Sequence, residues 1–383
     1  MSAHLHRFGT FLTLFVVVVV LAGHPAARAA EPTLDEGWQS SGPIEPQSLA
    51  ADAQGAVGLG RTGEVVVVDA AGLERWRRTI VADVDFGPVA IGADLVVVTV
   101  DDEGLIAFER ASSEGRWEHL AAGARDVAVG ATSDGTSAVA VVSDLGVLEL
   151  VDGATGTVRW TAAFPIADAI IAARTWVVGE RVVLFWTDDA GAHVRAFTSD
   201  GGSESWGSDF PESSSMAAVS DESVTIAENL RIDRRERVVT EIRHLAVLDG
   251  SELWARRSRS RSPYSSGLET VAAPQGIALV DLAGKVTVLD PSTGKVRWKM
   301  ATGLVQFEAE PHVVGEVFAM TTYGTGIMLA NMADGDAIST DALDPTQTAA
   351  TIEASAAAGD HLYLLVSRLW GDPEIWMLQA GPA

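Results

Sequence analysis

Tryptophan recurs along this chain at a nearly constant spacing, and this spacing limits the fold more than any other feature of the sequence. Seven tryptophans follow one another roughly 38 to 48 residues apart, and most of them close a turn-like segment. Short valine-rich runs and Gly/Asp turns fill the intervals. A period of about 40 to 45 residues built in this way is typical of the four-stranded blades of a β-propeller. The positions are Trp38, Trp76, Trp117, Trp160, Trp206, Trp254 and Trp298.

The two clearest repeats share the pattern D-x-x-T-G-x-x-x-W, at residues 152–160 and 290–298. This pattern predicts a hairpin, because Asp accepts bonds from turn amides, Gly adopts positive φ, and the next strand carries the Trp. Runs such as residues 96–100 are apolar on both faces, as expected for a blade packed between two neighbours. We expect the indoles to fill the wedge between blades. Ligand stacking is disfavoured, because one ligand cannot use seven equivalent positions around a ring.

The number of blades follows from the residues after Trp298, about 85 of them. Residues 327–340 form a degenerate seventh hairpin with Ser339 or Thr340 near the expected Trp. Three strands remain, at residues 352–357, 361–367 and 374–379, so the segment around Trp38 must supply the fourth. Pairing of the two chain ends would leave no open sheet edge. We predict an all-β propeller of eight four-stranded blades, with seven as the alternative if residues 84–117 are misread.

Composition excludes several classes of function. The chain has 52 acidic and 27 basic residues and a formal net charge of −25, which disfavours binding to nucleic acid or anionic lipid. Cysteine is absent, which removes disulfides, thiolate metal sites and cysteine nucleophiles.

The N-terminal residues resemble a secretory signal peptide. His4, His6 and Arg7 precede an apolar run over residues 8–23, and an A-x-A site follows at residues 27–29. An uncleaved anchor is the alternative, although the run is shorter than the roughly 20 residues that span a bilayer. His24 stands where a bacterial lipobox needs Cys, so we expect no lipid anchor. We therefore predict a signal peptide over residues 1–29 and one propeller domain over residues 30–383, periplasmic or secreted.

The repeated D-x-x-T-G-x-x-x-W motif resembles the pyrroloquinoline-quinone-type repeat of quinoprotein dehydrogenases and of the outer-membrane protein assembly factors. The resemblance covers nearly all of residues 34–380 and is strongest at residues 149–160 and 285–298. The length and the blade count are closer to the assembly-factor branch, which implies a non-catalytic propeller that docks other proteins. The motif itself is structural and carries the fold more safely than any activity.

A quinone-dependent or small-ligand-dependent oxidoreductase that uses the central funnel is the alternative function. The sequence has no Cys pair and no D-x-[DN]-x-[DN]-G calcium loop. Its acidic clusters fall in expected turns. The five histidines of the predicted mature chain lie in five different repeats, so no close pair suggests a zinc site. No catalytic, cofactor-binding or metal residue is assigned, and no cofactor is expected. A glycan- or peptide-binding module is a third, weaker alternative.

The repeat that ends at Trp254 is the longest and carries an unusual set of arginines. One group lies in an extended hairpin between the second and third strands, and the other follows Trp254. Both connections leave a blade at the same end, so the groups should share one face. Guanidinium groups bind oxyanions well, which suggests docking of an acidic or phosphate-bearing partner. A hairpin neutralised by its own acids is the alternative. The candidate residues are Arg231, Arg234, Arg235, Arg237, Arg256, Arg257, Arg259 and Arg261.

These observations together predict an interaction or scaffold module. We expect the partner to be another envelope or extracellular protein. We expect neither nucleic acid nor a direct membrane anchor after signal cleavage, and a monomeric chain.

Overall fold

All regular secondary structure in the described part of the chain is β-strand. The computed structural model describes residues 34–39, 46–80, 86–100, 103–121, 123–166, 169–210, 216–232, 238–260, 268–281, 284–301, 309–322, 326–338, 350–368 and 371–380. The predicted signal peptide lies outside these residues, whereas Pro32–Ala383 form one compact unit.

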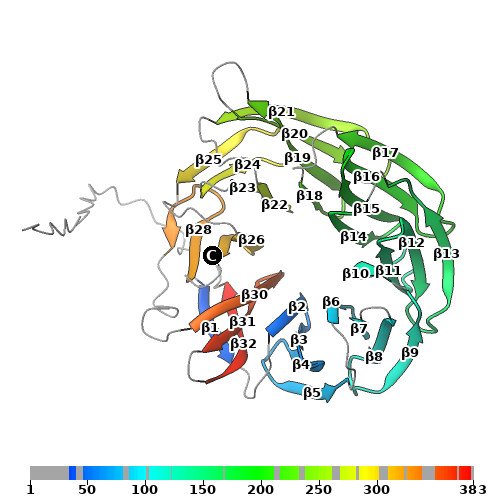
Figure 1. The fold of residues 1–383 in the computed structure, drawn as a ribbon. Coiled ribbons are helices and arrows are strands. Elements are labelled where there is room, and N and C mark those ends of the chain that lie inside the picture. Colours follow the sequence, from blue (N-terminus) through cyan, green and yellow to red (C-terminus); the bar gives the residue numbers. More distant parts are fainter. Residues whose placement is uncertain are drawn as a thin grey trace, which may run out of the picture. The chain divides into compact units, whose positions relative to one another are not determined.

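The strands form eight antiparallel four-stranded sheets, the blades of a propeller around a central opening (Figure 1). This confirms the predicted architecture and the count of eight. Within each of the first seven blades the strands pair in sequence order, from the innermost strand outward. The first four blades are β2 (Pro46–Asp52), β3 (Gly55–Gly60), β4 (Glu64–Asp69) and β5 (Glu74–Thr79); β6 (Phe86–Ile91), β7 (Leu95–Val100), β8 (Gly104–Glu109) and β9 (Gly115–His119); β10 (Ala124–Ala131), β11 (Ser137–Ser143), β12 (Val147–Asp152) and β13 (Val158–Ala163); and β14 (Ala172–Val178), β15 (Arg181–Asp188), β16 (Gly191–Thr198) and β17 (Glu204–Phe210).

The last four blades continue around the ring in the same way. They are β18 (Met216–Val219), β19 (Ser223–Ile232), β20 (Val238–Ala246) and β21 (Glu252–Ser260); β22 (Leu268–Ala273), β23 (Gly276–Asp281), β24 (Lys285–Leu289) and β25 (Val296–Ala301); β26 (Ala309–Val314), β27 (Val317–Thr322), β28 (Gly326–Asn331) and β29 (Ala337–Ile338); and β30 (Ala350–Ala358), β31 (His361–Arg368) and β32 (Gly371–Ala380) with the N-terminal strand β1 (Leu34–Gln39).

The two chain ends meet in blade 8, where β1 pairs with β32 as the outermost strand. Trp38 lies opposite Met377 in this register. The prediction that the segment around Trp38 completes the last blade is therefore confirmed. Its side chain lies outside the described residues, as do Ser339 and Thr340 in blade 7.

The valine-rich strands are buried on both faces because each blade packs between two others. Every residue of β7 is buried, and so is every residue of β3 and β23. Hydrophobic clusters consequently join neighbouring blades, and one of them combines β3 and β4 of blade 1 with β7 and β8 of blade 2. The stretch over residues 84–117, whose pattern is weak, forms a complete blade 2.

Each described indole of the tryptophan series binds the following blade. We call the turn between the third and fourth strands of a blade its outer turn. Each indole N–H donates to the carbonyl oxygen of the second residue of the outer turn in the next blade. The six bonds are 2.7–3.1 Å long and join Trp76 to Arg110, Trp117 to Gly153, Trp160 to Ser199, Trp206 to Val247, Trp254 to Pro291 and Trp298 to Met332.

The glycine of the turn motif is required by this contact. Gly294 has a φ of 64°, and a Cβ there would lie 2.6 Å from Cε3 of Trp254. A side chain at this position would therefore meet both backbone strain and a collision with the indole. In blade 2 the same position is Ser113, the only described residue other than glycine with positive φ, at 63°.

Candidate interaction surface

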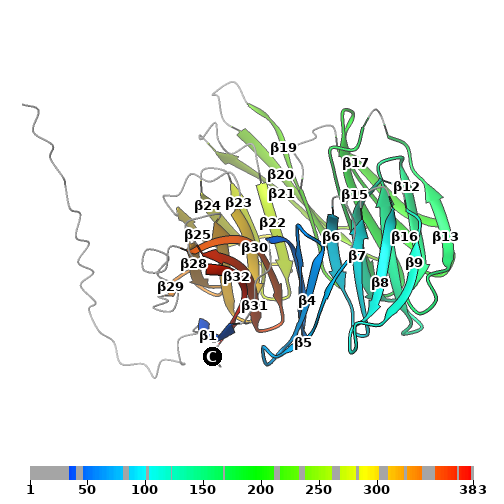
Figure 2. The same ribbon diagram turned by 60° about the horizontal axis from the view of Figure 1, so that its bottom comes forward.

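Blade 5 departs from the regular ring at one end. Its strands β19, β20 and β21 have 10, 9 and 9 residues, whereas β23, β24 and β25 of blade 6 have 6, 5 and 6. The longer strands rise beyond the neighbouring blades (Figure 2). Val239 of β20 pairs with both Arg231 of β19 and Arg259 of β21, so the two arginine-bearing strands flank β20 at the same end of the blade. Blade 5 thus presents its extension on a single face of the ring.

The described arginines of this extension differ in their surroundings. Arg257 and Arg259 are exposed on β21, the outermost strand of blade 5. Arg257 forms a 2.8 Å ion pair with Glu241, which also accepts a 3.2 Å contact from Arg243. Glu241 therefore neutralises part of the patch, as the alternative interpretation supposes. Arg234, Arg235, Arg237 and Arg261, together with the side chain of Arg231, lie outside the described residues.

Arg256 points the other way, toward blade 6. Its Nη1 donates a 2.9 Å hydrogen bond to the carbonyl oxygen of Gly294. Because Trp254 donates to Pro291 in the same turn, the two side chains of β21 hold this turn together. Arg256 therefore has two roles: it links blade 5 to the turn of blade 6, and it places a positive charge between these two blades.

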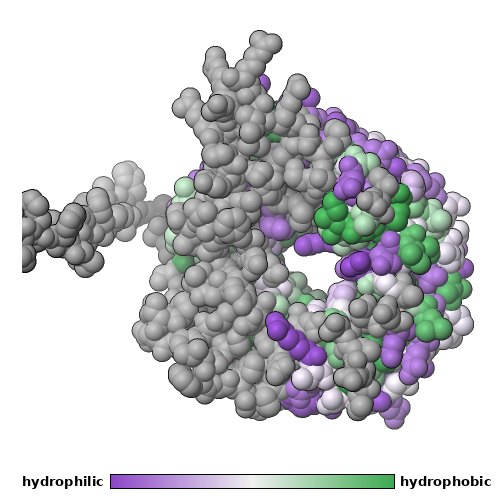
Figure 3. Space-filling view, viewed as in Figure 1, coloured by the Kyte–Doolittle hydropathy of each residue, from purple (hydrophilic) through white to green (hydrophobic). Residues whose placement is uncertain are grey.

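Three aliphatic side chains are exposed at the same end of the ring. Leu120 follows β9, Leu145 lies between β11 and β12, and Ile171 precedes β14; they are 83%, 74% and 63% exposed. Leu145 lies in a connection between the second and third strands of a blade, and Leu120 and Ile171 lie in connections from one blade to the next. Both kinds of connection leave a blade at the end where the extension of blade 5 lies. Figure 3 shows hydrophobic surface over the blades that contain β10 to β17. This end of the ring thus combines positive charge with accessible apolar side chains, a composition suited to contact with a protein.

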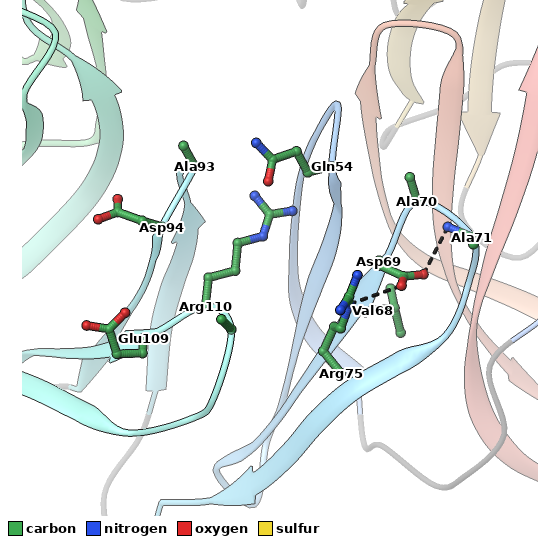
Figure 4. Close-up of a pocket in the computed structure, with 11 residues that line it drawn as sticks. Gln54, Val68, Asp69, Ala70, Ala71, Arg75, Ala93, Asp94, Glu109 and Arg110 are labelled. Atoms are coloured by element: carbon green, nitrogen blue, oxygen red, sulfur yellow. Dashed lines mark hydrogen bonds and ion pairs between the residues drawn. The ribbon is translucent and has the colours of Figure 1, made fainter.

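A cavity of about 620 Å³ lies at the opposite end, between blades 1 and 2 (Figure 4). It is formed by turns of both blades, and alanine methyl groups supply much of its wall. The lining residues are Gln54, Val68, Asp69, Ala70, Ala71, Arg75, Ala93, Asp94, Glu109, Arg110 and Ala111.

The charged side chains of this cavity form ion pairs with one another or with residues just outside its lining; Asp94 and Glu109, for example, both pair with Arg116. Arg110 binds both carboxylate oxygens of Asp52, at 2.5 and 2.8 Å, and the carbonyl oxygen of Gly92. Arg75 lies 3.0 Å from Asp69. These ion pairs fix the walls of the cavity. The site can accept a small polar molecule or a side chain of a partner, but its arginines are already committed to structural contacts.

The histidines occupy separate, partnered positions. His119 bonds Glu149, His193 lies between Asp188 and Asp209, His244 bonds Thr225 and stacks on Trp254, and His312 bonds Ser355. Within the described ranges, no three His, Asp or Glu side chains are placed to hold a metal ion. None of the described segments is a helix of the length and apolarity needed to span a membrane.

Sequence reasoning missed the arginine that directly precedes the tryptophan in four repeats. Each binds the acidic residue that opens its own outer turn. Arg297, for example, lies 2.9 Å from Asp290. Bonds from Ser292, Arg297 and Thr293 hold the pKa of Asp290 below its usual value. The other pairs are Arg75–Asp69, Arg116–Glu109 and Arg159–Asp152. The signal was visible as an R-W dipeptide whose arginine lies six or seven residues after the acid.

Comparison with known proteins agrees with this architecture. The family model described as outer membrane protein assembly factor BamB matches residues 27–163. BamB of Bordetella pertussis is 27% identical over 304 residues, which are 76% of this chain and 75% of that protein.

Solved structures show the same fold. The crystal structure of BamB from Moraxella catarrhalis has a TM-score of 0.61 at 16% identity and covers 91% of this chain and 98% of its own. The computationally designed Ika8 protein has a TM-score of 0.66 at 12% identity, with coverages of 90% and 99%. At these identities the structural likeness concerns the fold alone. The chain is thus an eight-bladed propeller of pyrroloquinoline-quinone-type repeats that resembles the outer membrane protein assembly factor BamB.

Proposed function

We propose that the chain is a non-catalytic protein-interaction module of the cell envelope, which holds a partner protein on the face that carries the extension of blade 5. The observation that carries this proposal is the composition of that face. Arg257 and Arg259 are exposed on β21, one of the long strands of blade 5 that extend at this end of the ring. Three aliphatic side chains, Leu120, Leu145 and Ile171, are exposed at the same end.

The rest of the ring favours a scaffold. Tryptophan hydrogen bonds join the blades at the six seams from blade 1 to blade 7, and the cavity between blades 1 and 2 has its arginines committed to ion pairs. Specificity then resides where the repeat is broken, because regular blades supply stability and loops supply recognition. The similarity to an outer membrane protein assembly factor supports the same class of function.

Export is part of the proposal. The signal peptide over residues 1–29 would deliver the propeller to the periplasm or the medium as a soluble monomer. Fractionation of the source cells, N-terminal sequencing of the mature chain and light scattering of the purified protein test these three points. A mature chain that begins before residue 25 and stays with the membranes would contradict them.

The interaction itself is tested by site-specific photo-crosslinking in the source cells. A photoreactive residue at Arg259 should capture one dominant envelope protein, identified by mass spectrometry. The matched control is Lys295, which is exposed in the outer turn of blade 6 at the opposite end of the ring. A photoreactive residue at Lys295 should not capture the protein that is captured at Arg259. Absence of a specific product at Arg259, or the same product at both sites, would overturn the proposal.

A second measurement asks whether the arginines contribute to binding. Arg257→Ser with Arg259→Ser should abolish capture of that partner with little change in melting temperature, because both arginines are exposed and the buried Glu241 keeps its contact with Arg243. Full capture by this double variant would place the contact elsewhere.

A further inference from the structure

A narrow groove separates blades 5 and 6 near the arginine-bearing end of the ring. Arg256 and Ser258 of β21 form one wall, and Lys285 and Thr287 of β24 form the other. Its floor consists of buried aliphatic side chains, Ile242, Leu279 and Leu289. The groove has a volume of about 40 Å³, which accommodates one small polar group.

Two positively charged side chains, Arg256 and Lys285, line this groove, and a third, Lys299, lies beside it. Lys299 pairs with Thr287 across β24 and β25, so it lies on the same face of blade 6 as Lys285, two residues away. Arg256 faces them from blade 5. In the part of the chain that the structure describes, none of these three side chains lies within 4.0 Å of a carboxylate oxygen. The one acid of the lining, Asp281, accepts a 2.9 Å bond from the main-chain N–H of Lys285.

The charges also act on one another. Partial burial, together with the positive charges of Lys285 and Arg256, lowers the pKa of Lys299. Such mutual repulsion favours binding of an anion between them.

The equivalent seam between blades 2 and 3 contains a carboxylate at a position where the groove between blades 5 and 6 has none. His119 stands two residues after Trp117, as Arg256 does after Trp254, and it bonds Glu149 at 2.8 Å. Glu149 precedes its turn aspartate by three residues, and the same position in blade 6 is Thr287. The groove between blades 5 and 6 therefore has Arg256 at the position of His119 and a neutral residue, Thr287, at the position of Glu149.

We propose that the groove between blades 5 and 6 binds a carboxylate side chain from an acidic segment of a partner polypeptide. The partner's carboxylate takes the place that Glu149 occupies in the earlier seam, between Arg256, Lys285 and Lys299. This inference rests on the proposed function and specifies the chemistry of the partner.

A polypeptide carboxylate fits the groove better than the other sources of oxyanions. The aliphatic floor can contact the methylene groups of a Glu side chain, whereas inorganic phosphate has no apolar part. A membrane surface would bring many negative charges against a protein of net charge −25, so repulsion opposes it. One acid with an aliphatic stem matches both the charge and the floor.

The test uses the mature chain and a fluorescein-labelled peptide in which two glutamates alternate with leucines. A second peptide with glutamine in place of glutamate is the control probe. We expect fluorescence anisotropy to show at least tenfold tighter binding of the glutamate peptide, with binding weakened by salt. Equal binding of both peptides would overturn the proposal. Displacement by millimolar phosphate, or tighter binding to vesicles of anionic lipid, would do the same.

Thr287→Glu is the decisive variant. It supplies within the chain the carboxylate that we assign to the partner, as Glu149 does for His119. It should weaken peptide binding at least tenfold without lowering the melting temperature. Lys285→Gln with Lys299→Gln should weaken binding similarly by removing charge. The matched control is Arg78→Gln, because Arg78 also lies two residues after a tryptophan and donates to a turn carbonyl, that of Ser113. Peptide binding by Thr287→Glu at wild-type affinity would overturn the proposal.

The same variant separates this inference from the proposed function. Wild-type crosslinking of the envelope partner by Thr287→Glu would exclude the groove and leave the interaction module intact. Binding of the glutamate peptide by a chain that crosslinks to no envelope protein would support the groove and refute the module.

Discussion

The indole N–H of Trp76 donates a 2.7 Å hydrogen bond to the carbonyl oxygen of Arg110 in the next blade. The guanidinium of the same arginine binds the carboxylate of Asp52 in blade 1. One residue of blade 2 is therefore tied to blade 1 by both its main chain and its side chain. Because similar indole bonds recur along the ring, its stability is distributed over the seams.

Trp76→Phe should lower the free energy of unfolding by about 1–3 kcal/mol, because the buried carbonyl oxygen of Arg110 loses its donor. Urea unfolding at pH 7 measures the change. Trp117→Phe serves as the comparison, since that indole is only partly buried and water can replace its bond to Gly153. Trp117→Phe should therefore lower the free energy of unfolding by less than Trp76→Phe does. A loss below about 0.5 kcal/mol for Trp76→Phe would show that the indole acts through packing alone.

Ser113→Gly should raise the free energy of unfolding by about 0.5–1 kcal/mol. Ser113 has a φ of 63°, which costs a residue with Cβ more than it costs glycine, although glycine loses more entropy on folding. The comparison variant is Gly202→Ala at the equivalent turn of blade 4. Its Cβ would lie 2.6 Å from Cδ2 of Trp160, so stability should fall by about 2–4 kcal/mol. Thermal and urea unfolding check both; a destabilised Ser113→Gly would mean that the hydroxyl or Cβ contributes to the turn.

Much of this fold could be predicted from the sequence because the repeat is local. The motif that opens at Asp290 and ends at Trp298 contains its own turn, its glycine and its docking side chain. Blade 2 carries Ser113 instead of glycine, and for this reason its pattern was weak. Its backbone still adopts the positive φ that the turn requires.

The candidate site could be predicted only in part. The sequence located the arginines around Trp254, and strand pairing could place them at one end of a blade. Which cations face each other across a seam depends on the rotation between blades, which no local pattern encodes. Lys285 and Lys299 belong to the candidate site only because β24 and β25 of blade 6 pack beside β21 of blade 5. The ion pair of Arg257 with Glu241 likewise depends on cross-strand register.

Acidification should change stability through Asp126 on the inner strand of blade 3. Its carboxylate accepts bonds of 2.6 and 2.9 Å from the N–H and hydroxyl of Thr175 in blade 4. Burial raises the pKa of Asp126 from 3.8 to about 6, so the folded state binds a proton more readily than the unfolded state. Protonation therefore favours folding, and this contribution is lost as pH rises from about 4 to 6.

The variant that reports this effect is Asp126→Asn. The stability of the wild type relative to Asp126→Asn should increase by about 3 kcal/mol when pH falls from 7 to below 3.8. Urea unfolding of both proteins across this range measures the difference. A difference that does not change with pH would contradict the assignment.

His312 should produce the opposite pH dependence at the seam between blades 7 and 8. Its Nε2 lies 2.7 Å from the hydroxyl oxygen of Ser355, so it joins the inner strands β26 and β30. Burial lowers the pKa of His312 from 6.5 to about 4. The unfolded state consequently binds the proton first, and stability is lost as pH falls from about 6.5 to 4.

His312→Gln can keep a hydrogen bond to Ser355 and cannot titrate. The wild type should lose about 3 kcal/mol relative to this variant between pH 7 and pH 4. The measurement is urea unfolding at half-unit pH intervals, with His361→Gln as the control, because His361 lies in the same blade as Ser355 at the start of β31. Parallel pH profiles for the wild type and His312→Gln would show that the imidazole is not held neutral at this seam. Because His361→Gln keeps His312, it should follow the wild-type profile. A profile flattened as much as that of His312→Gln would show that the loss is not specific to His312.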